Sequence, residues 1–177
     1  MMKDKIRKFW QRAALVYATA LLFPLTAAAQ AYDGDGDWKI YGGYVNFEGI
    51  QGFEMGCMRG LSDQFSISTY VSMLPKTDKW ESDFGALRGY DLGAQFDVHG
   101  AYLLNLSSWL DIYAGPKVSF ASAGLGAGLR INFSEEWGFY GYAQKNLVPV
   151  FDNQDNGKHS PYYKKFGFAI GITFTFL

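Results

Sequence analysis

The carboxyl-terminal stretch KKFGFAIGITFTFL, residues 164–177, carries the clearest structural signal in the chain. From Phe166 to Phe176 every second residue is Phe or Ile, and the residues between them are Gly, Ala or Thr. Successive side chains of a β-strand point to opposite faces, so a period of two predicts a strand with two unlike faces. The stretch therefore predicts a strand from Lys164 to Leu177 with one apolar face and one face of small residues.

Seven further alternating runs precede this strand, each bounded by turn residues. They cover approximately residues 38–47, 52–61, 65–73, 89–105, 109–120, 123–133 and 137–148. The faces of the first run are ambiguous, because Tyr and Gly occur on both. We therefore expect eight strands and no helix in the mature chain.

The connections between the runs also alternate in length. Those at 62–64, 106–108 and 134–136 are short and polar. In the opposite set, the connections from Leu74 to Arg88 and from Pro149 to Tyr163 are long, and those near Glu48-Gly49 and Ala121-Ser122 are tight. Short turns at one end and longer loops at the other are typical of outer-membrane barrels, whose short turns face the periplasm. The pattern predicts an all-β, eight-stranded antiparallel up-and-down transmembrane barrel.

A soluble lipocalin-like barrel would show the same alternation, so the face that lies inside needs separate evidence. The non-apolar face carries Gly, Ser, Thr and scattered opposite charges instead of many long Lys and Glu side chains, which suits a narrow lumen. Aromatic residues gather near the strand ends, as they do at the two water–lipid interfaces. Near the short turns these are Trp38, Phe65, Trp109, Trp137 and Phe176; near the longer loops they are Phe47, Phe53, Tyr90 and Phe120. These features favour the membrane barrel.

Residues 1–31 have the composition of a secretory signal peptide. Five basic residues precede the apolar segment from Ala13 to Leu25, and Ala29-Gln30-Ala31 fits the small-x-small cleavage rule, with Ala27-Ala28-Ala29 as an alternative. The apolar segment is shorter than the roughly 20 residues of a spanning helix, which argues against a retained anchor. We expect a mature barrel over residues 32–177.

The charge of the mature chain excludes one class of partner. Removing the signal takes away five of the 16 basic residues and one of the 17 acidic residues, leaving 11 and 16, a formal charge of about −5. A nucleic-acid partner would require a basic face, so none is expected. Cys57 is the only cysteine, so an intramolecular disulfide is impossible.

The end of the last run, Ala169-Ile170-Gly171-Ile172-Thr173-Phe174-Thr175-Phe176, carries a family resemblance. It is similar to the assembly signal of the small eight-stranded outer-membrane barrels of Gram-negative bacteria, of the OmpA-transmembrane-domain and OmpX kind. That group usually ends on the aromatic residue, whereas here Leu177 follows Phe176. The resemblance implies recognition of Gly171, Phe174 and Phe176 by the barrel-assembly machinery, and outer-membrane lipid and lipopolysaccharide as the surroundings.

Charged and polar residues on the predicted inner face form the candidate site. They are Glu54, Asp91, Asp97, His99, Asp111, Lys117 and Arg130. They could line a gate or narrow polar path, or form a buried network that fills the lumen. Because eight strands leave an interior just wide enough for side chains, a filled lumen is favoured.

Three other features of the sequence resemble functional sites. Asp33, Asp35 and Asp37 resemble the start of a calcium loop, but its twelfth position is Tyr44 and not Glu, which favours a solvated acidic lead-in. His99 could act as a general base with Ser119 or Asp111, or belong to the interior network. His159 and Ser160 are neighbours and point apart on an extended chain, so an ordinary surface loop is expected.

The sequence thus predicts a non-enzymatic barrel without cofactor or metal, with a structural or interaction role through its extracellular loops and an unknown ligand. Two alternatives stay open: a narrow transporter or channel for small solutes, and a lipid-modifying outer-membrane enzyme.

Overall fold

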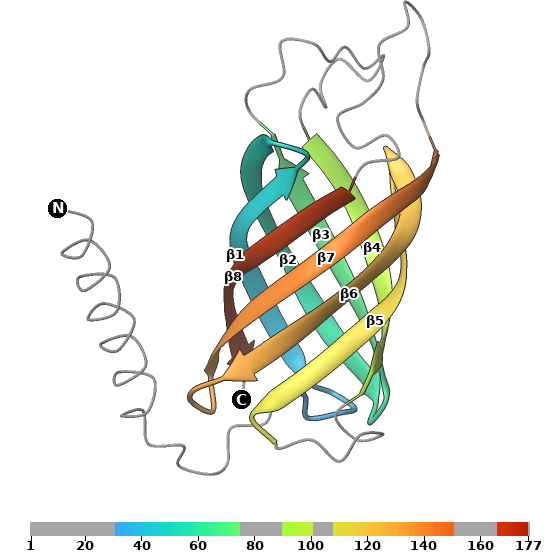
Figure 1. Ribbon diagram of the computed structural model, residues 1–177. Helices are drawn as coiled ribbons and strands as arrows, with labels where there is room; N and C mark the ends of the chain where they lie inside the picture. The colour runs from blue at the N-terminus through green and yellow to red at the C-terminus, as the bar shows by residue number, and fades with distance from the viewer. Residues whose placement is uncertain (1–30, 75–89, 101–107, 151–165, 177) are drawn as a thin grey trace, which may run out of the picture.

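Eight strands close into one antiparallel barrel in the computed structural model (Figure 1). The structure describes residues 31–74, 90–100, 108–150 and 166–176. Each strand pairs with its neighbours in sequence, and the first pairs with the last, so every strand has a partner on both sides. Within the described residues, no helix is long and apolar enough to cross a membrane. The predicted fold class is confirmed.

The strand bounds agree closely with the predicted runs. They are β1 Trp38–Phe47, β2 Ile50–Ser62, β3 Phe65–Met73, β4 Tyr90–His99, β5 Leu110–Ser119, β6 Ser122–Asn132, β7 Trp137–Pro149 and β8 Phe166–Phe176. β4 ends at His99, and residues 101–105 of the predicted fourth run lie outside the described residues. The predicted signal peptide up to residue 30, most of both long loops, His159, Ser160 and Leu177 lie outside the described residues.

The turn between β1 and β2 shows why this end of the barrel can be tight. Glu48 and Gly49 both have positive φ, 47° and 93°. Two-residue hairpin turns with positive φ at both central positions match the right-handed twist of the strands they join, and Gly adopts that conformation without strain. Asn46 supports the turn through its side-chain oxygen, which accepts a hydrogen bond of 2.8 Å from the Gly49 N–H.

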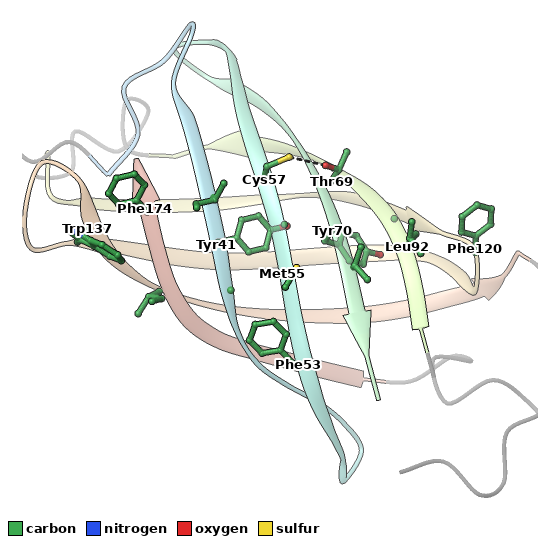
Figure 2. A pocket seen from close by; sticks show the side chains of 16 residues that line it. Tyr41, Phe53, Met55, Cys57, Thr69, Tyr70, Leu92, Phe120, Trp137 and Phe174 are labelled. Atoms are coloured by element: carbon green, nitrogen blue, oxygen red, sulfur yellow. Dashed lines mark hydrogen bonds between the residues drawn. The ribbon is translucent and has the colours of Figure 1, made fainter. Parts of the chain in front are cut away.

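The outer face of the barrel is almost entirely apolar. Large apolar side chains from all eight strands are exposed on it, including Ile40, Met55 and Ile172; part of this face is drawn in Figure 2. Among the strand residues, which the structure describes for all eight strands, only Arg59 and Lys145 are charged and exposed. A surface of this kind is stable only in lipid, since a monomeric soluble protein rarely exposes a large apolar patch.

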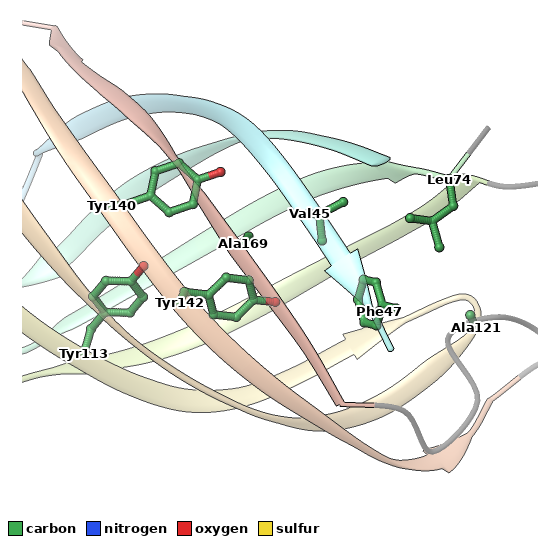
Figure 3. Packing of buried hydrophobic residues seen from close by; sticks show 8 residues of the cluster. All are labelled: Val45, Phe47, Leu74, Tyr113, Ala121, Tyr140, Tyr142 and Ala169. Atoms are coloured by element: carbon green, nitrogen blue, oxygen red, sulfur yellow. The ribbon is translucent and has the colours of Figure 1, made fainter. Parts of the chain in front are cut away.

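The inner face is filled by side chains, many of them Tyr (Figure 3). Each large ring lies over a glycine of the next strand. A Cβ at Gly56 would lie 2.5 Å from the Tyr41 ring, and one at Gly93 would lie 2.2 Å from the Tyr70 hydroxyl. Glycine on one strand therefore makes room for an aromatic ring on its neighbour, and the narrow lumen is packed.

One aromatic residue was assigned to the wrong face. Phe47 was expected at the lipid interface, but its side chain is 1% exposed and points into the barrel. It lies on the inward set of β1 with Val45, and its ring occupies the space that Gly167 of β8 leaves free. The ambiguity of the first run is the source of the error.

The two faces of β8 give the first testable prediction. Ile172→Arg puts a charge against lipid and should lower the free energy of unfolding by about 2–4 kcal/mol if it lies near the membrane midplane. Thr173→Ser, on the inner face, should leave that free energy nearly unchanged. Urea unfolding in lipid vesicles measures both, and a harmless Ile172→Arg beside an unfolded Thr173→Ser would mean that the two faces are reversed.

Candidate functional site

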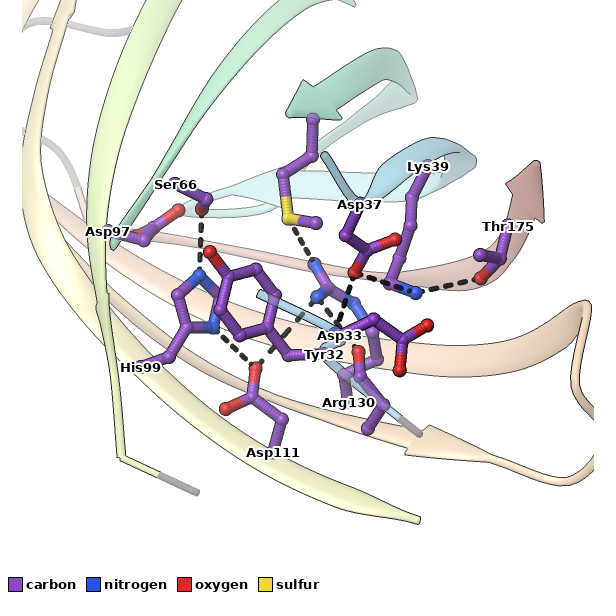
Figure 4. Close-up of polar contacts among 12 residues, drawn as sticks. Tyr32, Asp33, Asp37, Lys39, Ser66, Asp97, His99, Asp111, Arg130 and Thr175 are labelled. Atoms are coloured by element: carbon purple, nitrogen blue, oxygen red, sulfur yellow. Dashed lines mark hydrogen bonds and ion pairs between the residues drawn. The ribbon is translucent and has the colours of Figure 1, made fainter. Parts of the chain in front are cut away.

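Residues 32–37, called the N-terminal strap below, lie across the short-turn end of the barrel (Figure 4). The Tyr32 hydroxyl lies 2.6 Å from the Ser62 carbonyl oxygen and 2.5 Å from that of Phe65, and its single proton is shared between these two acceptors. The strap also pairs with β2, where the Gly36 N–H donates to the Gly60 oxygen at 3.2 Å and the Gly60 N–H donates to the Asp37 oxygen at 2.7 Å. The strap therefore connects β1 to the ends of β2 and β3 and covers this end of the lumen.

The acidic part of the strap differs from the expected solvated lead-in. Asp33 and Asp35 are exposed, but Asp37 is buried and its Oδ2 lies 3.1 Å from Lys39 Nζ. Lys39 also donates to Thr175 Oγ1 at 2.8 Å, which joins β1 to β8. In the described part of the chain, no group of three or more His, Cys, Asp or Glu side chains could hold a metal ion. Asp37 is a partner of the buried Lys39 and belongs to the barrel.

Burial changes the acid–base behaviour of two strap residues. Burial, together with the nearby Asp37 carboxylate, raises the pKa of the Tyr32 hydroxyl well above its usual value, so this hydroxyl stays protonated and remains a donor. Partial burial, with Asp37 again contributing, raises the pKa of the Asp33 carboxyl. The bonds from Tyr32 are therefore maintained at any physiological pH.

Directly above the strap, His99 links two strands through both ring nitrogens. Its Nδ1 lies 2.7 Å from Asp111 Oδ2 of β5, and its Nε2 lies 2.7 Å from Ser66 Oγ of β3. The Tyr32 ring is stacked on the imidazole, with a centroid distance of 3.6 Å and an interplanar angle of 3°. Of the two expected partners, Asp111 is in contact, whereas the Ser119 hydroxyl donates to the Ser122 carbonyl.

The order Ser66, His99, Asp111 resembles a nucleophilic triad, in which a carboxylate orients the histidine and the histidine activates the serine. All three residues are completely buried, and they face the lumen and not the lipid. Tyr32 covers one face of the imidazole, and Ser66 and His99 are both buried away from the lipid. The arrangement fits a hydrogen-bond network that holds β3, β4 and β5 together.

Arg130 extends this network across the lumen. Its guanidinium lies 3.8 Å from Asp111 Oδ2 and 5.1 Å from the Tyr113 ring centroid, and its Nη2 donates to Met58 Sδ of β2 at 3.4 Å. Asp97 accepts a hydrogen bond of 2.6 Å from Gln95. Arg130 thus neutralises the buried carboxylate and joins β6 to β5 and β2.

Lys117 occupies the middle of the lumen inside a ring of acceptors. It donates to the Tyr142 hydroxyl and to Gln144 Oε1, and its Nζ lies 3.8 Å from Glu54 Oε2 and 3.7 Å from the Tyr70 ring centroid. Glu54 also accepts a hydrogen bond of 2.7 Å from Ser72. The cavity beside these groups is only about 20 Å³, room for about one water molecule.

The long-loop end is closed by apolar side chains. Val45, Phe47, Leu74 and Ala121, called the apolar cap below, form the buried cluster at this end (Figure 3). Asp91 lies beside the cap, where its Oδ1 accepts a hydrogen bond of 3.1 Å from the Ala121 N–H. All seven predicted network residues are therefore inside the barrel, in three groups: around His99, around Lys117 and at Asp91.

Several important residues were missed at the sequence level. Lys39 could have been found, because it alternates with the outward residues Trp38 and Ile40. Ser66 alternates with the outward residues Phe65 and Ile67, but its contact with His99 depends on how the strands are staggered. Tyr32 lies outside any periodic run, so no pattern marked it.

The predicted assembly residues lie where the last strand closes the barrel. The Phe174 ring lies 4.9 Å from Trp137 and 5.3 Å from Phe176, centroid to centroid, and Gly171 leaves room for the Tyr140 ring. Their recognition by assembly machinery stays a prediction.

The contact between Asp111 and Arg130 gives the second testable prediction. Asp111→Asn should destabilise the barrel by about 3–5 kcal/mol, because it leaves Arg130 buried without its carboxylate. Combined with Arg130→Gln, it should cost less than the sum of the two single changes. Urea unfolding of the four proteins gives the coupling energy, and simple additivity would contradict a direct pair.

Comparisons with known proteins show the fold. No protein-family model matches the chain, and no curated protein does. A de novo designed transmembrane β-barrel has a TM-score of 0.55 at 12% identity, covering 81% of this chain and 98% of the design. The N-terminal β-barrel domain of Pseudomonas aeruginosa OprF has 0.52 at 11% identity, covering 81% and 100%. OprG, an outer membrane protein of the same organism, has 0.51 at 10% identity, covering 83% and 99%. The chain has the fold of the small eight-stranded transmembrane β-barrels.

Proposed function

We propose that the protein is a non-enzymatic outer-membrane barrel with a closed lumen, whose role is structural or depends on interactions of its extracellular loops. The observation that carries this proposal is that both ends of the lumen are closed. The apolar cap fills the long-loop end, and the N-terminal strap covers the short-turn end. Between them Lys39, Lys117 and Arg130 each lie within 4 Å of a carboxylate, and the cavity beside Lys117 is only about 20 Å³, so no continuous aqueous path remains among the described residues.

The buried network argues against both alternatives. A channel for solutes needs charged groups that line water, but Lys117, Glu54 and Arg130 are at most 5% exposed. A lipid-modifying enzyme needs its catalytic groups at the lipid face, but His99 is completely buried inside the barrel. The interior is filled by packed side chains and gives neither solutes nor lipids access to its charged groups.

Contacts among the strands themselves hold the barrel wall, which leaves the loops available for interactions. Every strand pairs with a neighbour on both sides, and the filled lumen supports the wall from inside. Connections on a rigid scaffold are free to vary and to carry binding residues. The two long connections, residues 75–89 and 151–165, are therefore the proposed interaction segments.

Conductance in planar lipid bilayers tests the closed lumen. The wild-type protein should give no current steps above the bare membrane, because both ends are blocked. Lys117→Gln serves as the control, since it removes the central cation without opening either end. Discrete steps from the wild type, changed in size by Lys117→Gln, would establish the channel instead.

Loop replacement tests the other half of the proposal. Exchanging residues 77–87 or 153–162 for short Gly-Ser turns should leave the folded fraction unchanged, measured by the mobility difference between unboiled and boiled samples. Surface binding, measured by adhesion of cells that express each variant to host-cell or matrix preparations, should fall. Loss of the folded fraction, or unchanged adhesion in both variants, would contradict an interaction role for the loops.

A further inference from the structure

A furrow crosses the outer face of the barrel. It has a volume of about 1120 Å³ and runs from Trp137 and Phe174 at one end to Leu92 and Phe120 at the other (Figure 2). Trp137 begins β7 at the short-turn end, and Phe120 follows β5 at the long-loop end, so the furrow crosses the wall obliquely. Its lining is apolar over nearly all of its surface.

The strand register explains why a furrow forms on a convex wall. One row of outward residues across the strands includes Ile172, Gly42 and Met55, and the adjacent row includes Ile40, Cys57 and Thr69. Gly42, Cys57 and Thr69 are small, whereas Phe53, Phe120 and Phe174 stand at the edges. Small residues in the middle and large ones at the sides produce the hollow.

The floor of the furrow contains almost no free polar group. Cys57 Sγ lies 3.1 Å from Thr69 Oγ1, a hydrogen bond across β2 and β3. These two groups satisfy one another, so neither requires water or a polar ligand. The furrow accordingly fits a hydrocarbon chain.

A cation stands beside the furrow on its short-turn side. Arg59 is the next outward residue of β2 after Cys57, and its guanidinium lies 5.4 Å from the Trp38 ring centroid. Arg59 is paired in register with Trp38, the first residue of β1, which places it near the short-turn interface. Arginine on a lipid face extends its head group to the interface, where phosphate is its natural bidentate partner.

From these observations we infer that the furrow is a binding site for one phospholipid of the periplasmic leaflet, with an acyl chain in the furrow and the phosphate at Arg59. From β8 to β3 the short-turn part of the furrow crosses three strand spacings, about 14 Å at roughly 4.8 Å each. One leaflet of a bilayer contributes about 15 Å of hydrocarbon. This part of the furrow is thus about as long as an acyl chain of the periplasmic leaflet, and Arg59 lies on its short-turn side.

Photocrosslinking tests this site. The full-length mature protein is folded into phosphatidylcholine vesicles that contain a small fraction of phosphatidylglycerol with a diazirine in one acyl chain. After irradiation, mass spectrometry locates the labelled peptides. Labelling should be severalfold higher on β2 and β3 than on β6, whose outward residues such as Leu129 lie on a different part of the wall. Equal labelling of all walls would show ordinary annular lipid and overturn the site.

Variants separate the two parts of the site. Cys57→Phe fills the furrow and should abolish the enrichment, whereas Ala127→Phe, the matched change on β6, should leave it intact. Should Cys57→Phe fail to fold by gel mobility, Thr69→Leu obstructs the furrow from β3. Arg59→Gln should reduce labelling by the phospholipid to the level of a diazirine-labelled diacylglycerol, which lacks phosphate. Unchanged enrichment in Cys57→Phe or in Arg59→Gln, or crosslinked dimers through β2, would overturn the inference.

Discussion

A barrel wall in hydrocarbon must satisfy all of its own backbone hydrogen bonds, and the rest of this structure follows from that constraint. Water is absent from the hydrocarbon core, so each unpaired N–H or C=O there costs several kcal/mol. An open eight-stranded sheet would expose two such edges. Pairing of Trp38–Phe47 with Phe166–Phe176 removes both edges. Closure in turn determines that one set of alternate side chains faces lipid and the other shares a narrow lumen.

The narrow lumen explains the composition of the inner face. A large ring fits only where the neighbouring strand has a glycine at the paired position. This accounts for the combination of Tyr41 with Gly56 and of Tyr70 with Gly93. Charges can enter only with partners, so Lys39 is joined to Asp37, and Arg130 to Asp111. Arg130 and Asp111 are register partners on the neighbouring strands β6 and β5, and Asp37 lies two residues before Lys39, so each pair neutralises a buried charge locally.

The sequence predicts the faces of the strands well and the contacts inside the barrel poorly. The period of two placed Glu54, His99 and Arg130 on the inner side, because orientation is a local property of each strand. The contact between His99 and Ser66 depends on the stagger between strands, which no single run contains. Phe47 was misplaced because aromatic residues suit both an interface and a glycine-lined lumen. The strap was not anticipated, since Tyr32 acts through contacts with β2, β3 and β4 and not through any periodic pattern.

The pairing of β1 with β8 also has a kinetic consequence. The bond from Lys39 to Thr175 joins residues 136 positions apart, and the whole seam between the two strands has a similar separation in sequence. Contacts between distant parts of a chain form late, because the loop entropy must be overcome first. Seven strand pairs can form progressively between neighbours, whereas the eighth waits for the last residues to arrive. The chain must therefore travel to the membrane with two unpaired strands at its ends, which makes protection from aggregation during transit as important to this protein as its final stability.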